Sequence, residues 1–220
     1  MSEKMLVTQA LDERDLLVKK IADKIAKASF VDTIKPNEDK VFVMRTSREE
    51  YAREAESAYQ QINDLIERFQ KIDAAIVASN AKTEITTSYG TFTVAGAISL
   101  RSRLRGLGSY AEDADFEGRL QKKLTYEYND RIQFRDKKNS QLQATAEEMR
   151  LSILGKDSKT KDEKPLGVVE AYVKENTTEL VDPLDVKKKI EQLTEKRGTL
   201  LTELDTQIKV SNATTFIEVA

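Results

Sequence analysis

Residues 51–76, YAREAESAYQQINDLIERFQKIDAAI, decide the fold of this chain. Apolar residues recur there at alternating steps of four and three, at Tyr51, Ala55, Ala58, Ile62, Leu65, Phe69, Ile72 and Ile76. This spacing keeps one stripe facing a neighbour, as in a coiled coil, although a helix of an ordinary bundle can show the same stripe. The pattern therefore predicts a long helix packed along another helix. Ser47, followed three residues later by Glu50, predicts where that helix begins.

Amphipathic patterns predict further helices on both sides of this stretch, over about residues 5–28, 97–107, 116–154 and 166–175. A final helix is expected to open at Asp182, with Pro183 in the first helical position. It carries a second seam of the same spacing, which Arg197 interrupts and which includes Leu200, Leu204 and Ile208. The chain should therefore be mainly α-helical.

Between the helices, alternation of apolar and polar residues predicts short strands. Residues 83–95 predict a β-hairpin with strands at 83–87 and 91–95, and residues 214–219 predict a C-terminal strand. Residues 41–44 could form a short strand or an apolar clamp on the helices, and residues 155–165 predict a mobile loop. We expect one elongated domain over residues 1–220, a helical bundle or coiled coil with a small sheet at one end.

An internal repeat relates two places in the sequence. Residues 72–85 (IDAAIVASNAKTEI) align without a gap to residues 204–217 (LDTQIKVSNATTFI), with seven identities. Both copies predict a helix that ends at an asparagine, Asn80 or Asn212, because asparagine tolerates the left-handed conformation that often ends helices. The repeat predicts two helices that end at one level, with their strands side by side.

The residues that carry this repeat also carry a family resemblance. The opening ALDERDL at 10–16 with Lys20-Ile21, the SNA at 79–81, GTFT at 90–93 before Ala97-Ile98 and Arg101, and the closing 204–212 together resemble the septicolysin-like family. These are small, largely uncharacterised helical proteins of bacteria and phages. The resemblance implies a helical bundle and brings no established activity, since the family's name points to a cytolysin without giving a mechanism.

Composition argues against the common kinds of catalytic site. The 220 residues include no cysteine and no histidine, which removes thiolate nucleophiles, imidazole bases and the usual zinc ligands. No phosphate-binding glycine loop, nucleophile elbow or calcium loop occurs in the sequence. We therefore expect a protein that is not an enzyme, with no cofactor and no metal.

The charge and the apolar runs bear on partners and location. Lysine and arginine number 36 against 38 acids, so no global field draws the chain to nucleic acid or an anionic membrane. No apolar run approaches the roughly 18 residues of a membrane helix, and hairpin arms of about five residues are short of the 9–11 that cross a bilayer. We expect no membrane partner and a cytoplasmic location, or a virion if the gene belongs to a phage.

Two functional hypotheses follow. The favoured one is a non-catalytic interaction or assembly protein, for example a virion component, which self-associates as a dimer or binds a helical partner through an interaction seam of Ile62, Leu65, Phe69, Ile72, Ile76, Leu200, Leu204 and Ile208. The alternative is a module that binds nucleic acid or an acidic effector through Arg101, Arg103 and Arg105, which lie in a stretch without acids. The opposing explanation is that Arg101 and Arg105 pair with acids of a neighbouring helix. A membrane-acting cytolysin is the least favoured reading.

Overall fold

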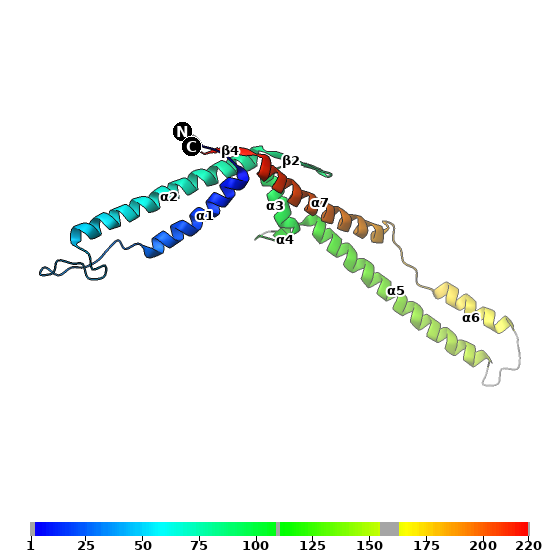
Figure 1. Cartoon of the computed structure of the whole chain (residues 1–220). Helices are drawn as coiled ribbons and strands as arrows, with labels where there is room; N and C mark the ends of the chain where they lie inside the picture. Colours follow the sequence, from blue (N-terminus) through cyan, green and yellow to red (C-terminus); the bar gives the residue numbers. More distant parts are fainter. Residues whose placement is uncertain (1–2, 109–110, 155–162, 220) are drawn as a thin grey trace. The chain divides into compact units, whose positions relative to one another are not determined.

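The computed structural model describes residues 3–108, 111–154 and 163–219 and is mainly α-helical, as the sequence predicts (Figure 1). It divides into two compact units. Unit 1 comprises Met1–Ser102 and Leu200–Ala220, and unit 2 comprises Arg103–Thr199. That the two units form a single elongated domain stays a prediction.

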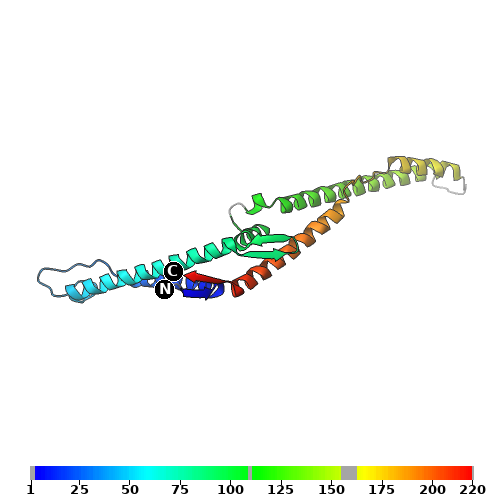
Figure 2. The ribbon, with the colours of Figure 1, turned by 90° about the horizontal axis from the view of Figure 1, so that it is seen from above.

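In unit 1, the two helices α1 (Val7–Lys27) and α2 (Arg48–Lys82) lie side by side as a helical hairpin (Figures 1 and 2). The hydroxyl of Ser47 accepts the N–H of Glu50 at 3.2 Å, so α2 begins where the capping pattern predicts. The expected first helix begins two residues later than predicted, because residues 3–6 form a strand. We call this helical hairpin the arm.

In the part of the chain that the structure describes, four strands form two separate two-stranded sheets. β1 (Glu3–Leu6) pairs antiparallel with β4 (Phe216–Val219), and β2 (Glu84–Thr87) pairs antiparallel with β3 (Gly90–Thr93). The predicted hairpin is confirmed, but the expected single sheet of residues 83–87, 91–95 and 214–219 is wrong. The C-terminal strand pairs with the N-terminal one because β1 buries Met5 in the same cluster as Ile217 and Val219 of β4.

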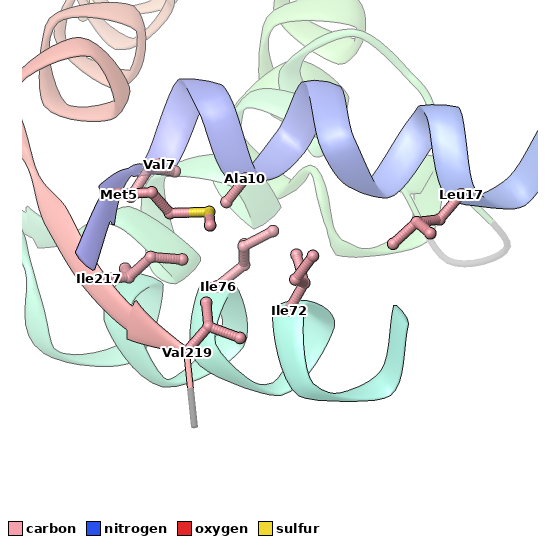
Figure 3. Packing of buried hydrophobic residues seen from close by; sticks show 8 residues of the cluster. All are labelled: Met5, Val7, Ala10, Leu17, Ile72, Ile76, Ile217 and Val219. Carbon is pink, nitrogen blue, oxygen red and sulfur yellow. The ribbon is translucent and has the colours of Figure 1, made fainter. Parts of the chain in front are cut away.

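The main core of unit 1 lies where the arm meets the terminal strands. Its buried members come from β1, α1, α2 and β4: Met5, Val7, Ala10, Leu17, Ile72, Ile76, Ile217 and Val219 (Figure 3). Leu65 and Phe69 of α2 pack against this cluster and are partly buried. The part of the predicted α2 seam from Leu65 to Ile76, which we call its upper half, thus packs within the chain.

The structure bears out the internal repeat at the level of elements. Helix α7 (Val186–Thr214) and strand β4 correspond, at a constant offset, to α2 and β2, and Thr83 and Thr215 stand at equivalent places between helix and strand. Two details of the expectation are wrong. The repeated strands lie in different sheets, and Asn80 and Asn212 lie inside their helices, which run on for two more residues.

A second repeat, which the sequence analysis missed, completes the first. Strand β3 and helix α3 (Val94–Leu104) correspond to β1 and α1, and both helices carry Val-x2-Ala-x3-Arg-x2-Leu, with the valine and alanine buried. The Val7 N–H donates to the Thr215 carbonyl at 2.9 Å, and the Val94 N–H donates to the equivalent Thr83 carbonyl at 2.8 Å. Unit 1 is therefore built from two equivalent halves, each a strand–helix and a helix–strand, and each sheet takes one strand from each half.

Two ion pairs obey the same correspondence. Arg14 of α1 contacts Asp73 of α2 at 3.3 Å, and the equivalent Arg101 of α3 contacts Asp205 of α7 at 3.5 Å. Two shallow hollows, of about 320 and 380 Å³, are lined by nine residues each that map onto one another. The equivalence extends from the sequence to the contacts and the surface.

Unit 2 contains α4 (Ala111–Ala114), α5 (Phe116–Leu154), α6 (Glu163–Asn176) and the first part of α7, and α5 packs against α6. The last helix begins at Val186 and not at Pro183, because the Asp182 carboxylate accepts the N–H groups of Leu184 and Val186 and holds a turn. Of the predicted mobile loop at 155–165, residues 155–162 lie outside the described residues, and 163–165 begin α6.

Candidate functional site

Residues 28–47 join α1 to α2, and we call them the tip loop. One carboxylate within this loop accepts several of its backbone N–H groups. Asp32 accepts the N–H of Thr33 at 2.7 Å, of Val43 at 3.0 Å and of Met44 at 2.9 Å. The expected strand or clamp at residues 41–44 is a turn, closed by a hydrogen bond from the Arg45 N–H to the Val41 carbonyl at 3.2 Å. Asp32 is thereby joined to the turn at residues 41–45.

The electrostatics of Asp32 favour its ionised form. Partial desolvation raises the pKa of this carboxyl. The N–H groups of Met44, Thr33 and Val43 and the charge of Arg45 together lower the pKa by more than desolvation raises it. The net effect is a pKa below the ordinary value for aspartate. The carboxylate thus holds the loop at neutral pH.

The tip loop presents large apolar side chains to solvent. Val31 is 86% exposed, Val43 69% and Phe42 57%, and Phe30 and Met44 are also exposed. The neighbouring Val41 is only 4% exposed and anchors the loop. Several large apolar side chains that a loop holds exposed are typical of a protein-interaction site.

Two contacts of the tip loop involve aromatic rings. The guanidinium of Arg45, a residue in the left-handed region at φ 59°, lies 5.3 Å from the ring centroid of Phe42. Phe30 meets Tyr59 of α2 edge to face, with ring centroids 6.3 Å apart. These contacts orient both phenylalanine rings without burying them.

A groove runs along the arm beside the tip loop, and we call it the arm groove. Its volume is about 780 Å³. One wall comes from α1 and its first loop residue, the other from α2: Lys20, Asp23, Lys24, Lys27, Ala28, Arg53, Glu54, Ser57, Ala58, Gln61, Ile62 and Leu65. The apolar part of the lining is Ala28, Ala58, Ile62 and Leu65, so the lower half of the predicted α2 seam borders this groove.

The remaining residues of the predicted interaction seam are mostly buried. Ile62, Ile72 and Ile76 of α2 and Leu200, Leu204 and Ile208 of α7 are all buried. Because the upper α2 seam is covered by α1 and the terminal strands, it offers a partner little surface.

The predicted arginine patch is divided by its contacts. Arg101 forms the ion pair with Asp205, as the opposing explanation expects, and both side chains are mostly buried. Arg103 is exposed at the end of α3, and Arg105 follows that helix. Of the three arginines, Arg101 is thus held in an ion pair within unit 1, and Arg103 is exposed to solvent.

Residues 3–108, 111–154 and 163–219 contain no group of acidic side chains arranged to hold a metal ion. In the same part of the chain, no helix combines the length and the apolar character that crossing a bilayer requires.

The sequence analysis missed the tip loop as a site. The sequence contained an indication of it, because Phe30, Val31 and residues 42–44 bring apolar side chains into a segment that Pro36 and Asn37 mark as a loop.

Comparison with protein-family models, curated proteins and solved structures found no match to this chain.

Proposed function

We propose that this chain is a non-catalytic interaction and assembly protein that binds protein partners through the tip loop, with a second copy of itself as the favoured partner. The observation that supports the proposal most directly is the fixed tip loop, with five large apolar side chains exposed: Phe30, Val31, Phe42, Val43 and Met44. Holding these residues in place costs conformational entropy during folding. A surface that is already ordered then loses less conformational entropy when it binds a partner.

The charge of the tip supports a protein partner over a membrane. Residues 28–50 contain four basic and five acidic side chains, so the apolar surface has no positive surround to attract an anionic bilayer. An apolar protein surface needs no such attraction. A dimer in which two tip loops cover one another is the simplest closed assembly.

The expectations about location, family resemblance and the arginine alternative are part of this proposal or are weighed against it. A cytoplasmic location, or a virion for a phage gene, suits an assembly protein, and the resemblance to the septicolysin-like family adds no activity to it. The arginine alternative has weaker support than the tip loop, because Arg101 is held by Asp205 and only part of the predicted patch is exposed.

Sedimentation velocity over a range of concentrations tests the proposal. We expect the full chain to form dimers, and the double change Phe42→Ser, Val43→Ser to weaken association at least tenfold, because both side chains lose their apolar surface. The matched control is Leu16→Ser, Val18→Ser, which removes two similarly exposed apolar side chains from α1. Circular dichroism melting checks that both variants fold.

Two results would overturn parts of this proposal. A chain that stays monomeric at high micromolar concentration contradicts self-association. If the tip-loop change leaves the dimer intact and the α1 change disrupts it, the interface lies on α1 and not on the tip loop.

A further inference from the structure

We infer that the arm groove is a docking site for one amphipathic helix of a partner protein, with acidic residues beside its apolar stripe. This inference rests on the proposed function, since it names a partner class for the arm, but it concerns a different surface from the tip loop. The groove would make the two-helix arm a local three-helix bundle.

The spacing of the lining residues is that of two helix faces. Lys20, Asp23, Lys24, Lys27 and Ala28 follow one another at steps of three, one, three and one, which is one face of α1 and its continuation. The α2 wall repeats this spacing from Arg53 to Leu65. At a rise of 1.5 Å per residue these walls run for about 12 and 18 Å, enough for roughly two to three turns of a docked helix.

A helix fits this groove better than an extended peptide does. Both walls are formed chiefly by helices, whose backbone groups are already hydrogen-bonded, so the groove offers no strand edge to which an extended peptide could pair. A helix satisfies its own backbone and needs from the groove only apolar contact, which Ala58, Ile62 and Leu65 supply.

The rim of the groove selects the charge of that helix. Four basic side chains, Lys20, Lys24, Lys27 and Arg53, stand against two acids, Asp23 and Glu54. Within the described residues, Asp23 pairs with Lys27 at 2.7 Å and Lys24 donates to the neutral Gln61 at 2.8 Å, while Lys20 and Arg53 make no ion pair. The net positive rim complements glutamates or aspartates that flank an apolar stripe.

Fluorescence anisotropy with two synthetic peptides tests the inference on the full chain. Both peptides are 18-residue amphipathic helices with the same leucine stripe, one flanked by glutamates and the other by lysines. We expect the glutamate peptide to bind at least tenfold more tightly, and its affinity to fall with added salt, because salt screens exposed charges. The double change Lys20→Glu, Arg53→Glu should reverse the preference.

A second variant separates the groove from its charge and from the tip. Ala58→Phe fills the floor and should abolish binding of both peptides, whereas Phe42→Ser, Val43→Ser should leave peptide binding unchanged. Equal affinity for the two peptides, no binding of either, or binding that survives both groove variants would overturn the inference. Peptide binding without self-association would contradict only the proposed tip-loop dimer.

Discussion

At the scale of single residues, Asp32 links distant parts of the tip loop. Its carboxylate accepts the backbone N–H groups of Thr33, Val43 and Met44, and so helps to hold the turn that exposes the apolar side chains. Val41 and Val43 are two residues apart in one apolar run, yet the first is buried and the second exposed. The pattern of the sequence could not separate them.

Replacing this carboxylate should open the tip loop. In Asp32→Asn the acceptor charge is lost, so the amides of Val43 and Met44 should exchange hydrogen at least tenfold faster than in the unchanged protein. Mass-spectrometric hydrogen exchange over residues 28–47 measures this. Asp39→Asn, at an exposed residue of the same loop, is the matched control and should leave exchange unchanged.

The same carboxylate predicts a pH response. Its pKa is lowered in the folded protein, so its stabilisation is fully present above the unfolded-state pKa and is lost as the pH falls through the folded one. The loop should be protected at pH 6 and should open in strong acid before α1 and α2 melt. Protection in Asp32→Asn that equals the unchanged protein at pH 6 would show that Asp32 does not hold the loop.

At the scale of elements, one ion pair explains the polar interruption in the second seam. Arg197 of α7 makes two hydrogen bonds, of 2.6 and 2.5 Å, to the carboxylate of Asp115, which precedes α5. The side chains are only 17% and 20% exposed. Asp115 also accepts the N–H of Gly118 at 3.1 Å, so the pair joins the beginning of α5 to α7 within unit 2.

Removing the arginine should destabilise unit 2 measurably. Arg197→Met leaves Asp115 without its paired donors, and losing hydrogen bonds to a charged group should cost about 1.5–3 kcal/mol of unfolding free energy. Arg197→Lys should lose less than Arg197→Met, because the ammonium keeps a charged donor for Asp115, but it should still lose some stability, because it cannot donate in the same paired geometry. Arg150→Met, which breaks the exposed pair with Glu147 at 3.2 Å, is the control and should cost at most about 1 kcal/mol.

Acid should abolish this difference. The hydrogen bonds from Arg197 lower the pKa of Asp115 more than desolvation raises it, with smaller help from the Gly118 N–H and nearby cations. The stabilisation is therefore present above the unfolded-state pKa and disappears as the pH falls through the folded one. Urea unfolding at pH 7 and in strong acid measures both values, and an Arg197→Met penalty that persists in acid would mean that packing, not the ion pair, is responsible.

The elements show how far the sequence predicts this fold. The seam of α2 and its Ser47 cap predict that helix almost to the residue, because periodicity and capping are local properties. The pairing of β4 with β1 could not be predicted in this way. The sequences of strands as short as Glu84–Thr87 and Phe216–Val219 do not indicate which strand each pairs with. The motif at Val7 and Val94 was visible in the sequence and would have indicated the partner strand, because each valine N–H bonds to the carbonyl of a repeated threonine.

At the scale of the whole molecule, the two repeats make unit 1 a duplicated structure whose halves exchange strands. The correspondence places the pair Glu3–Val219 at the position that Gly90–Thr87 occupies in the other half. In the second case the strands are joined by Ser88 and Tyr89. In the first case the two ends of the described chain lie opposite one another.

The correspondence predicts that the chain tolerates circular permutation at one place. A permutant that begins at Tyr89, ends at Ser88 and joins Val219 to Glu3 through a two-residue Ser-Tyr link exchanges the two equivalent connections. Opposite residues of an antiparallel pair lie about 4.5–5.5 Å apart, so two residues span the gap. Because one short loop closes as another opens, the unfolding free energy should change by no more than about 1 kcal/mol.

A permutant whose new ends lie inside a core helix should not be tolerated. A permutant opened between Gln60 and Gln61, in the middle of α2, breaks a helix that supplies Ile72 and Ile76 to the core and should melt well below the first permutant or fail to fold. Thermal melting followed by circular dichroism compares the two. Failure of the permutant opened at Ser88 would mean that the contacts of this turn with α7, where the Ser88 N–H donates to Glu203 at 2.8 Å, have become indispensable to one half only. A cooperative transition near that of the unchanged chain would instead show that both connections are interchangeable, as the two equivalent halves require.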